Sequence, residues 1–223
     1  MRPYLAQVWA IVRKDLAVER RSRELLTAMF VFALTVILVF SFSFELRVER
    51  VREVAPGVLW VAITFAGMLG LGRSFVSERD QGCLDGLLLA PIERSAIFVG
   101  KMLGNLIFIS MVEIVTLPIY LALFDLPFRP LLLAVLALGT VGYAAVGTLF
   151  SAMAMHGRAR EVLLPVLLFP VAIPMIIAAV KLTGGLFDAQ PWETIANWFH
   201  FLVAFDVIFL TLAILAFDAV LEE

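Results

Sequence analysis

Six long stretches of apolar residues divide this chain, and they constrain its fold more than any other feature of the sequence. A helix needs about 20 mostly apolar residues to cross the roughly 30 Å hydrocarbon core of a bilayer. Inside the bilayer each backbone polar group must find its partner within the protein, which requires helices for such segments. The sequence therefore predicts six transmembrane helices, at residues 25–44, 58–71 (extending as far as 76), 102–124, 131–155, 162–180 and 198–217.

The composition excludes the soluble classes of protein. Of the 223 residues, 62% are hydrophobic and 16% are charged, whereas soluble domains have roughly 45–50% and about 25%. A soluble core of this size cannot bury such an excess. The single cysteine, Cys83, excludes an intrachain disulfide and a cysteine-rich metal site. We interpret the chain as an all-α integral membrane protein with one transmembrane domain over residues 1–223, whose spans lie within 25–217.

The distribution of basic residues predicts the orientation of the spans. Twelve of the 17 Lys and Arg residues lie in the N-terminal segment and in the loops after the second and fourth spans. Five lie on the opposite side. Because basic residues are enriched in cytoplasmic loops, both termini are expected in the cytoplasm. The net charge of −2 gives no reason to expect nucleic acid as a partner.

Residues 1–24 are expected to form an amphipathic helix that lies in the cytoplasmic interface of the membrane. Apolar residues such as Val8, Trp9, Val12 and Leu16 recur at helical spacing, and basic residues occupy the rest of the segment. Basic helices with aromatic residues on the apolar face bind the membrane surface. The alternative is that this segment is only a positively charged anchor for the first span.

The loop between the second and third spans contains a short apolar block with charged flanks, and we expect a helix at residues 78–93 that docks on another protein. An exposed leucine cluster in a small loop is otherwise unexplained, and a proline stops the helix. The alternative, an interfacial helix against the lipid headgroups, stays open. The residues assigned to docking are Glu78, Arg79, Asp80, Gly82, Leu84, Asp85, Leu87, Leu88 and Pro91.

The loop at residues 181–197 is expected to form a re-entrant or interfacial turn, because Phe187 and Trp192 are typical of the membrane boundary. His156 and His200 are expected at opposite membrane faces, so they cannot form one metal site, and no metal site is predicted. We expect each histidine to pack as an interfacial polar residue. The alternative is a role as a haem or metal ligand.

Two acids, Glu113 and Asp206, lie near the middle of predicted spans. An isolated carboxylate is costly in hydrocarbon, so each side chain is expected to face the bundle interior. One interpretation is a path for protons or substrate. We favour a protonated carboxyl group that bonds to a neighbouring Ser, Thr or backbone carbonyl, because no third polar residue lines up with either acid.

Motifs of catalysis and nucleotide binding are missing from the sequence. It contains no GxxxxGK[ST] phosphate loop, so we do not expect this chain to bind ATP. It contains no HExxH and no GxSxG motif either. A membrane-embedded enzyme is therefore the least favoured class of function.

Four blocks of sequence resemble a known family. Three of them read APGVLWVA at 55–62, LGTVGYAAVGTLFSAMA at 138–154 and LLPVLLFPVAIPMIIAA at 163–179. The fourth, at 73–101, contains in order Asp80, Gly82, Leu84, Asp85, a leucine block, Pro91 and Lys101. These blocks resemble the CcmB family, the haem-exporter permeases of bacterial cytochrome c maturation and membrane subunits of ABC-2 type exporters.

The resemblance implies a non-catalytic permease in the bacterial inner membrane. Two copies of the chain would pair with two copies of a separate ABC ATPase, which binds the ATP, and with further membrane subunits that handle haem. Residues 78–93 would be the coupling helix. Haem, as substrate, would be exported, or a haem-loaded periplasmic chaperone released. Two alternatives remain open, namely a proton-coupled secondary transporter and an assembly subunit through which no substrate passes.

Overall fold

Helices form all the regular structure in the described part of the chain. The computed structural model describes residues 2–44, 51–75, 82, 92–155 and 160–220. Six of the helices are long and apolar enough to cross a membrane, which confirms the all-α prediction with six spans. The helices are α1 (Arg2–Ser22), α2 (Glu24–Phe44), α3 (Val51–Ser74), α6 (Arg94–Leu123), α7 (Leu131–Ala154), α8 (Arg160–Phe187) and α9 (Trp192–Val220).

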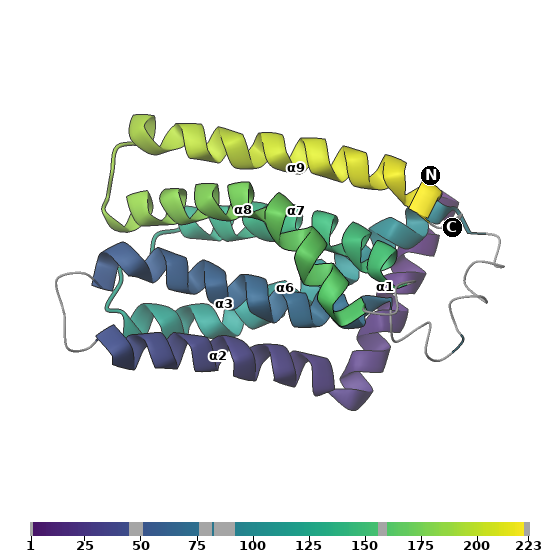
Figure 1. Ribbon diagram of the computed structural model, residues 1–223, viewed down its shortest axis with the longest axis horizontal. Helices are drawn as coiled ribbons and strands as arrows, with labels where there is room; N and C mark the ends of the chain where they lie inside the picture. Colours follow the sequence, from purple (N-terminus) through teal and green to yellow (C-terminus); the bar gives the residue numbers. More distant parts are fainter. Residues whose placement is uncertain (1, 45–50, 76–81, 83–91, 156–159, 221–223) are drawn as a thin grey trace.

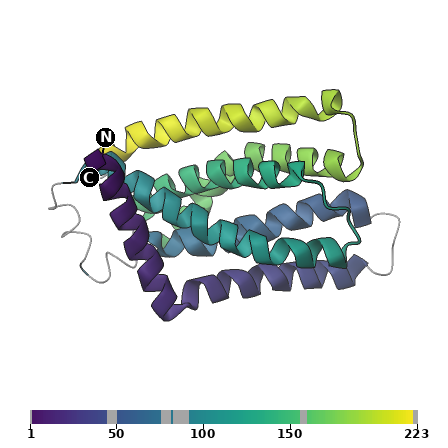
Figure 2. The ribbon, with the colours of Figure 1, turned by 180° about the vertical axis from the view of Figure 1, so that it is seen from behind.

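The six spans run lengthwise beside one another, and α1 crosses one end of the bundle (Figures 1 and 2). We call this end the α1 end. Helix α1 begins there, and α3 and α9 end there. The spans α3 and α7 are central, since 67% of the span window of each is buried, against 17% for α2 and 22% for α9.

The predicted amphipathic helix is confirmed as α1. Its apolar residues fall into a buried group and an exposed group, which the sequence does not show. Val8, Ile11 and Val12 are buried against the bundle. Leu5 and Trp9 are 61% and 56% exposed. An exposed apolar strip on a helix that crosses the end of a membrane bundle is typical of burial among lipid headgroups, and this placement stays a prediction.

A single residue, Arg23, joins α1 to α2 and adopts a positive φ of 54°. A left-handed residue commonly ends a helix, because it lets the chain turn sharply while its N–H still bonds to the last helical turn. Here the N–H of Arg23 donates to the carbonyl of Glu19 at 2.8 Å. The buried carboxylate of Glu19 accepts from the N–H of Leu26 at 2.9 Å, which satisfies a free donor in the first turn of α2.

Close packing of α3 on α7 and α8 forms the centre of the bundle. The indole N–H of Trp60 donates to the hydroxyl of Thr183 at 3.0 Å, and the hydroxyl of Tyr143 donates to the carbonyl of Thr64 at 2.6 Å. The Trp60 ring lies where a Cβ at Gly139 would be. Small residues allow membrane helices to approach closely, and side-chain hydrogen bonds then join them.

The helices are longer than the predicted spans, and the predicted outer loop at 181–197 is wrong. Helix α8 continues to Phe187 and α9 begins at Trp192, so only residues 188–191 connect them. The prediction ended the span before Lys181, but a long basic side chain can reach the interface while its helix continues. Leu182 and Ile195 are buried within this extended helical region.

The fifth span is one continuous helix although it contains three prolines. Pro165, Pro170 and Pro174 all lie inside the continuous helix α8. Proline is tolerated in membrane helices because neighbouring groups can satisfy the freed carbonyls. Pro170 and Pro174 lie on the exposed face of α8.

Candidate functional site

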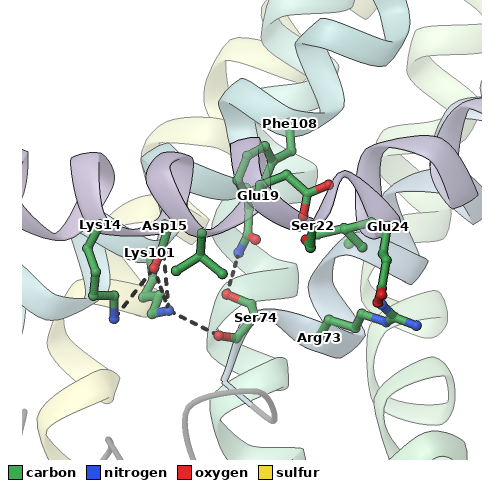
Figure 3. Close-up of a pocket in the computed structure, with 13 residues that line it drawn as sticks. Lys14, Asp15, Glu19, Ser22, Glu24, Arg73, Ser74, Lys101 and Phe108 are labelled. Atoms are coloured by element: carbon green, nitrogen blue, oxygen red, sulfur yellow. Dashed lines mark hydrogen bonds and ion pairs between the residues drawn. The ribbon is translucent and has the colours of Figure 1, made fainter.

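The α1 end holds the most deeply buried charge that the structure describes, the ammonium group of Lys101, which is 2% exposed. Its Nζ lies 3.1 Å from Oδ2 of Asp15 on α1 and donates to the carbonyl of Ser74 at 3.0 Å (Figure 3). The same atom lies 5.6 Å from the centre of the Phe75 ring. A buried ammonium group requires such partners, because leaving water without them is costly.

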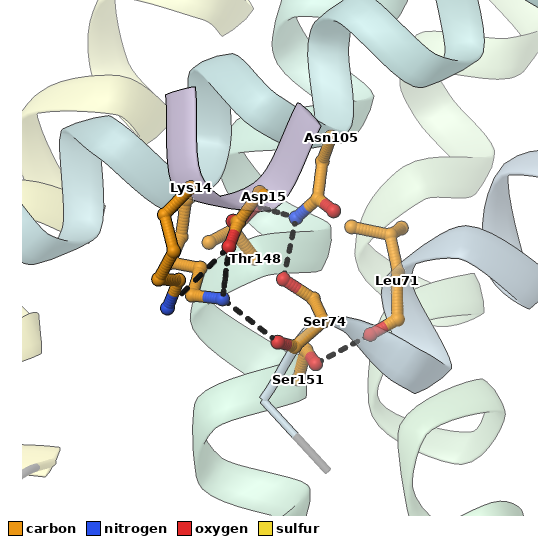
Figure 4. A network of polar contacts seen from close by, with 8 residues as sticks. Lys14, Asp15, Leu71, Ser74, Asn105, Thr148 and Ser151 are labelled. Carbon is orange, nitrogen blue, oxygen red and sulfur yellow. Dashed lines mark hydrogen bonds and ion pairs between the residues drawn. The ribbon is translucent and has the colours of Figure 1, made fainter. Parts of the chain in front are cut away.

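Asn105 extends this arrangement one helical turn along α6. Its amide nitrogen donates to the Ser74 hydroxyl at 3.2 Å and to the Thr148 hydroxyl on α7 at 2.9 Å (Figure 4). We name Asp15, Ser74, Lys101, Asn105 and Thr148 the Lys101 cluster. It joins four helices, α1, α3, α6 and α7, at one point.

The cluster caps the C-terminal end of α3. The last four carbonyls of a helix have no partner within it, and a positive charge there is favoured by the helix dipole. Lys101 bonds to the carbonyl of Ser74, the last residue of α3. Ser151 on α7 donates to the carbonyl of Leu71 at 2.6 Å. The end of α3 is therefore held by side chains from two other helices.

Helix α1 also contacts the other end of the connection between α3 and α6. The N–H of Glu93, just before α6, donates to the side-chain carbonyl of Gln7 at 3.4 Å. Gly100 lets α1 approach α6, since a Cβ there would lie 2.8 Å from Cβ of Ile11. The chain thus leaves α3 and enters α6 close to the same helix.

A cavity of about 360 Å³ lies beside the Lys101 cluster (Figure 3). Across it Arg73 pairs with Glu24 at 3.5 Å, and both side chains are largely exposed. Its three basic and three acidic side chains balance one another, so it has no net charge to attract an ion. The lining residues are Lys14, Asp15, Val18, Glu19, Ser22, Glu24, Leu25, Gly70, Arg73, Ser74, Lys101, Asn105 and Phe108.

The residues assigned to docking lie almost entirely outside the described part of the chain. Gly82 is the exception, an exposed turn residue with a φ of +66°. The structure thus leaves the docking assignment and the predicted helix at 78–93 untested. The docking residues outside the described ranges are Glu78, Arg79, Asp80, Leu84, Asp85, Leu87, Leu88 and Pro91.

Glu113 is buried and has a polar partner on another span. The hydroxyl of Thr140 on α7 donates to its carboxyl group. The sequence could not show this, because the two residues lie on different spans. Bonding to a neighbouring threonine is the arrangement we favoured for this acid.

Asp206 is also buried, but neither of its carboxyl oxygens has a hydrogen-bond partner among the described residues. It lies against α7 at Gly142. Gly142 and Thr140 are two residues apart, about 200° around a helix. The two acids therefore contact opposite faces of α7 and do not face each other across a shared path.

Of the two histidines, the structure describes only His200. His200 is exposed on α9 with its ring edge-on to Phe199, and His156 lies outside the described residues. Within the described ranges no group of three or more His, Cys, Asp or Glu side chains could hold a metal ion.

Sequence reasoning missed Asp15, Ser74, Asn105 and Thr148, and it noted Lys101 only as part of a family pattern. One signal was available. Lys101 and Asn105 are four residues apart, which places them on one face of a mostly apolar helix. Their partners could not be found in the same way, because Asp15 and Lys101 are 86 positions apart.

Known proteins resemble this chain over most of its length. A family model described as CcmB protein matches residues 6–223. Heme exporter protein B of Paracoccus denitrificans is 27% identical over 216 residues, which cover 96% of this chain and 97% of that protein. The protein of the same name from Rhodobacter capsulatus is 29% identical, with 78% of this chain and 80% of that protein covered. The one from Pseudomonas aeruginosa is 28% identical, with 71% of each covered.

Proposed function

The chain belongs to the CcmB family, and we propose that it is the membrane subunit of a haem exporter that serves cytochrome c maturation. The observation that carries this proposal is the family match over residues 6–223. A relative named heme exporter protein B, similar over 96% of the chain, supports it. The six helices that can cross a membrane are in keeping with a permease.

The energy for this function would come from a separate ABC ATPase, in a complex with two copies of each chain. This chain has no phosphate-binding loop, so ATP would be bound by the partner. The ATPase would dock on residues 78–93. Two observations support this placement. The segment contains a leucine block with charged flanks, and the described residues on both sides of it lie at the α1 end.

The complex would lie in the bacterial inner membrane with its α1 end in the cytoplasm. The excess of Lys and Arg in the segments on that side supports the orientation. Haem would be the substrate, handled together with further membrane subunits. The output would be haem export or the release of a haem-loaded periplasmic chaperone.

A docking variant tests the partnership with the ATPase. Replacing Leu84, Leu87 and Leu88 together with alanine, or Asp85 with lysine, should abolish co-purification with the ATPase while the melting temperature stays unchanged. Leu133→Ala is the control, because this exposed leucine lies near the start of α7, far from the α1 end. If the docking variants retain both the ATPase and its turnover, the docking assignment is wrong.

A further inference from the structure

We propose that Lys101 is a positioning residue that fixes where the docking segment leaves the bundle, and that it links this segment mechanically to α1 and α7. The inference rests on the proposed function, since it takes residues 78–93 as the ATPase contact. It adds a set of contacts through which a displacement of that segment would be transmitted to the spans.

The first step is the position of Lys101 relative to the ends of the docking segment. Its own helix, α6, begins at Arg94, seven residues or about 10 Å earlier. Its ammonium group bonds to Ser74, the last residue of α3. One side chain therefore ties the helix before the docking segment to the helix after it.

The second step is the link to α1. Asp15 pairs with Lys101, and Gln7, two turns earlier on α1, accepts from the N–H of Glu93. Helix α1 is thus fixed directly to the start of α6, and it is linked to the end of α3 through the bond from Lys101 to Ser74. A displacement of that segment would move α1 together with the ends of α3 and α6.

The third step is the link into the spans. Asn105 joins the Ser74 hydroxyl to Thr148 on α7. Phe75, which follows α3 directly, is fully buried and packs on Phe217 at the end of α9, with ring centres 6.1 Å apart. The end of α3 is thereby in contact with both α7 and α9.

The fourth step concerns why a charge is used here. A buried ion pair is a poor way to gain stability, because an apolar pair of similar size often serves as well or better. What the pair supplies is a defined position for the Lys101 side chain, because its ammonium group can bond only to acceptor atoms. This favours a positioning role over a purely stabilising one.

The test uses a double variant that removes both charges, Asp15→Asn with Lys101→Met. It is expected to fold, because both partners of the pair are replaced together. The matched control is Glu24→Gln with Arg73→Gln, which removes an exposed ion pair from the same cavity. Lys101→Arg keeps the positive charge, so this variant should retain part of the function that the double variant loses.

Two readouts separate positioning from stability. The first is cytochrome c maturation in cells, which should fall at least fivefold while the purified complex retains at least half of its ATP hydrolysis. The second is the distance distribution between spin labels on Trp9→Cys and Met153→Cys, two exposed positions on α1 and α7, measured in the purified chain with Cys83→Ser. It should broaden in the double variant and stay unchanged in the control.

Unchanged maturation and an unchanged distance distribution in the double variant would overturn the proposal, as would an equal loss in the control. If the double variant does not fold, Asn105→Leu removes the bond to the Ser74 hydroxyl and should broaden the distribution by less. The distance measurement does not need the ATPase. If the wild-type chain fails to bind an ATPase, the proposed function fails, while this measurement still decides the role of Lys101.

Discussion

The ammonium group of Lys101 lies 3.1 Å from the carboxylate of Asp15, and this pair joins the helix that crosses the end of the bundle to the spans beneath it. It is the point where the end of α3, the start of α6, the amphipathic helix and the span α7 meet. The contacts around it predict how the chain responds to substitution.

Removing Lys101 alone should be strongly destabilising. Lys101→Ala leaves Asp15 without its partner and the end of α3 without its cap, so we expect a loss of about 3–5 kcal/mol in the free energy of unfolding. The control Glu24→Gln removes half of an exposed pair and should cost under about 1 kcal/mol. Chemical unfolding in detergent micelles measures both. Equal losses would show that burial of Lys101 has no energetic consequence.

Gly139→Ala should disturb the centre of the bundle. A Cβ at this position meets the buried ring of Trp60, and overpacking of this kind costs about 1–3 kcal/mol. Gly57→Ala is the matched control, since a Cβ on this helical glycine meets nothing within 4 Å. Alanine there should be neutral or stabilising by up to about 1 kcal/mol. Thermal unfolding compares the two, and a stable Gly139→Ala variant would contradict the packing described.

Glu113→Gln should leave the function of the chain intact. The carboxamide oxygen of glutamine can still accept from the Thr140 hydroxyl, so the contact between α6 and α7 is kept. Asp206→Asn should likewise be tolerated. Cytochrome c maturation in cells carrying each variant is the measurement. If either variant folds normally but loses function, the carboxyl group is part of a proton or substrate path and our interpretation is wrong.

The number and type of spans could be predicted because hydropathy and backbone hydrogen bonding leave few choices in a membrane. The residues at which the spans begin and end could not be predicted. Lys181 ended a predicted span, yet α8 continues to Phe187, because the side chain is exposed while the helix buries Leu182. Hydropathy shows where a charged residue occurs in the sequence. It does not show whether the charged end of that side chain reaches the membrane surface.

The polar contacts between spans could not be predicted from the sequence either. Thr140 and Glu113 lie on different helices, and only the packing of α6 on α7 brings them together. Asp15 was one of several charges in an amphipathic helix, and nothing local shows that this acid, rather than Glu19, pairs with a lysine on a span. The pairing of Asp15 with Lys101 depends on the angle at which α1 crosses the bundle, which Arg23 and Gly100 help to set.

The central claim, that this chain is the membrane subunit of a haem exporter for cytochrome c maturation, is tested most directly by haem staining. Cells that lack the chain should contain no c-type cytochrome with covalent haem. Wild-type protein should restore the stained bands, and the variant with alanine at Leu84, Leu87 and Leu88 should not. Normal staining in cells without the chain would contradict the account.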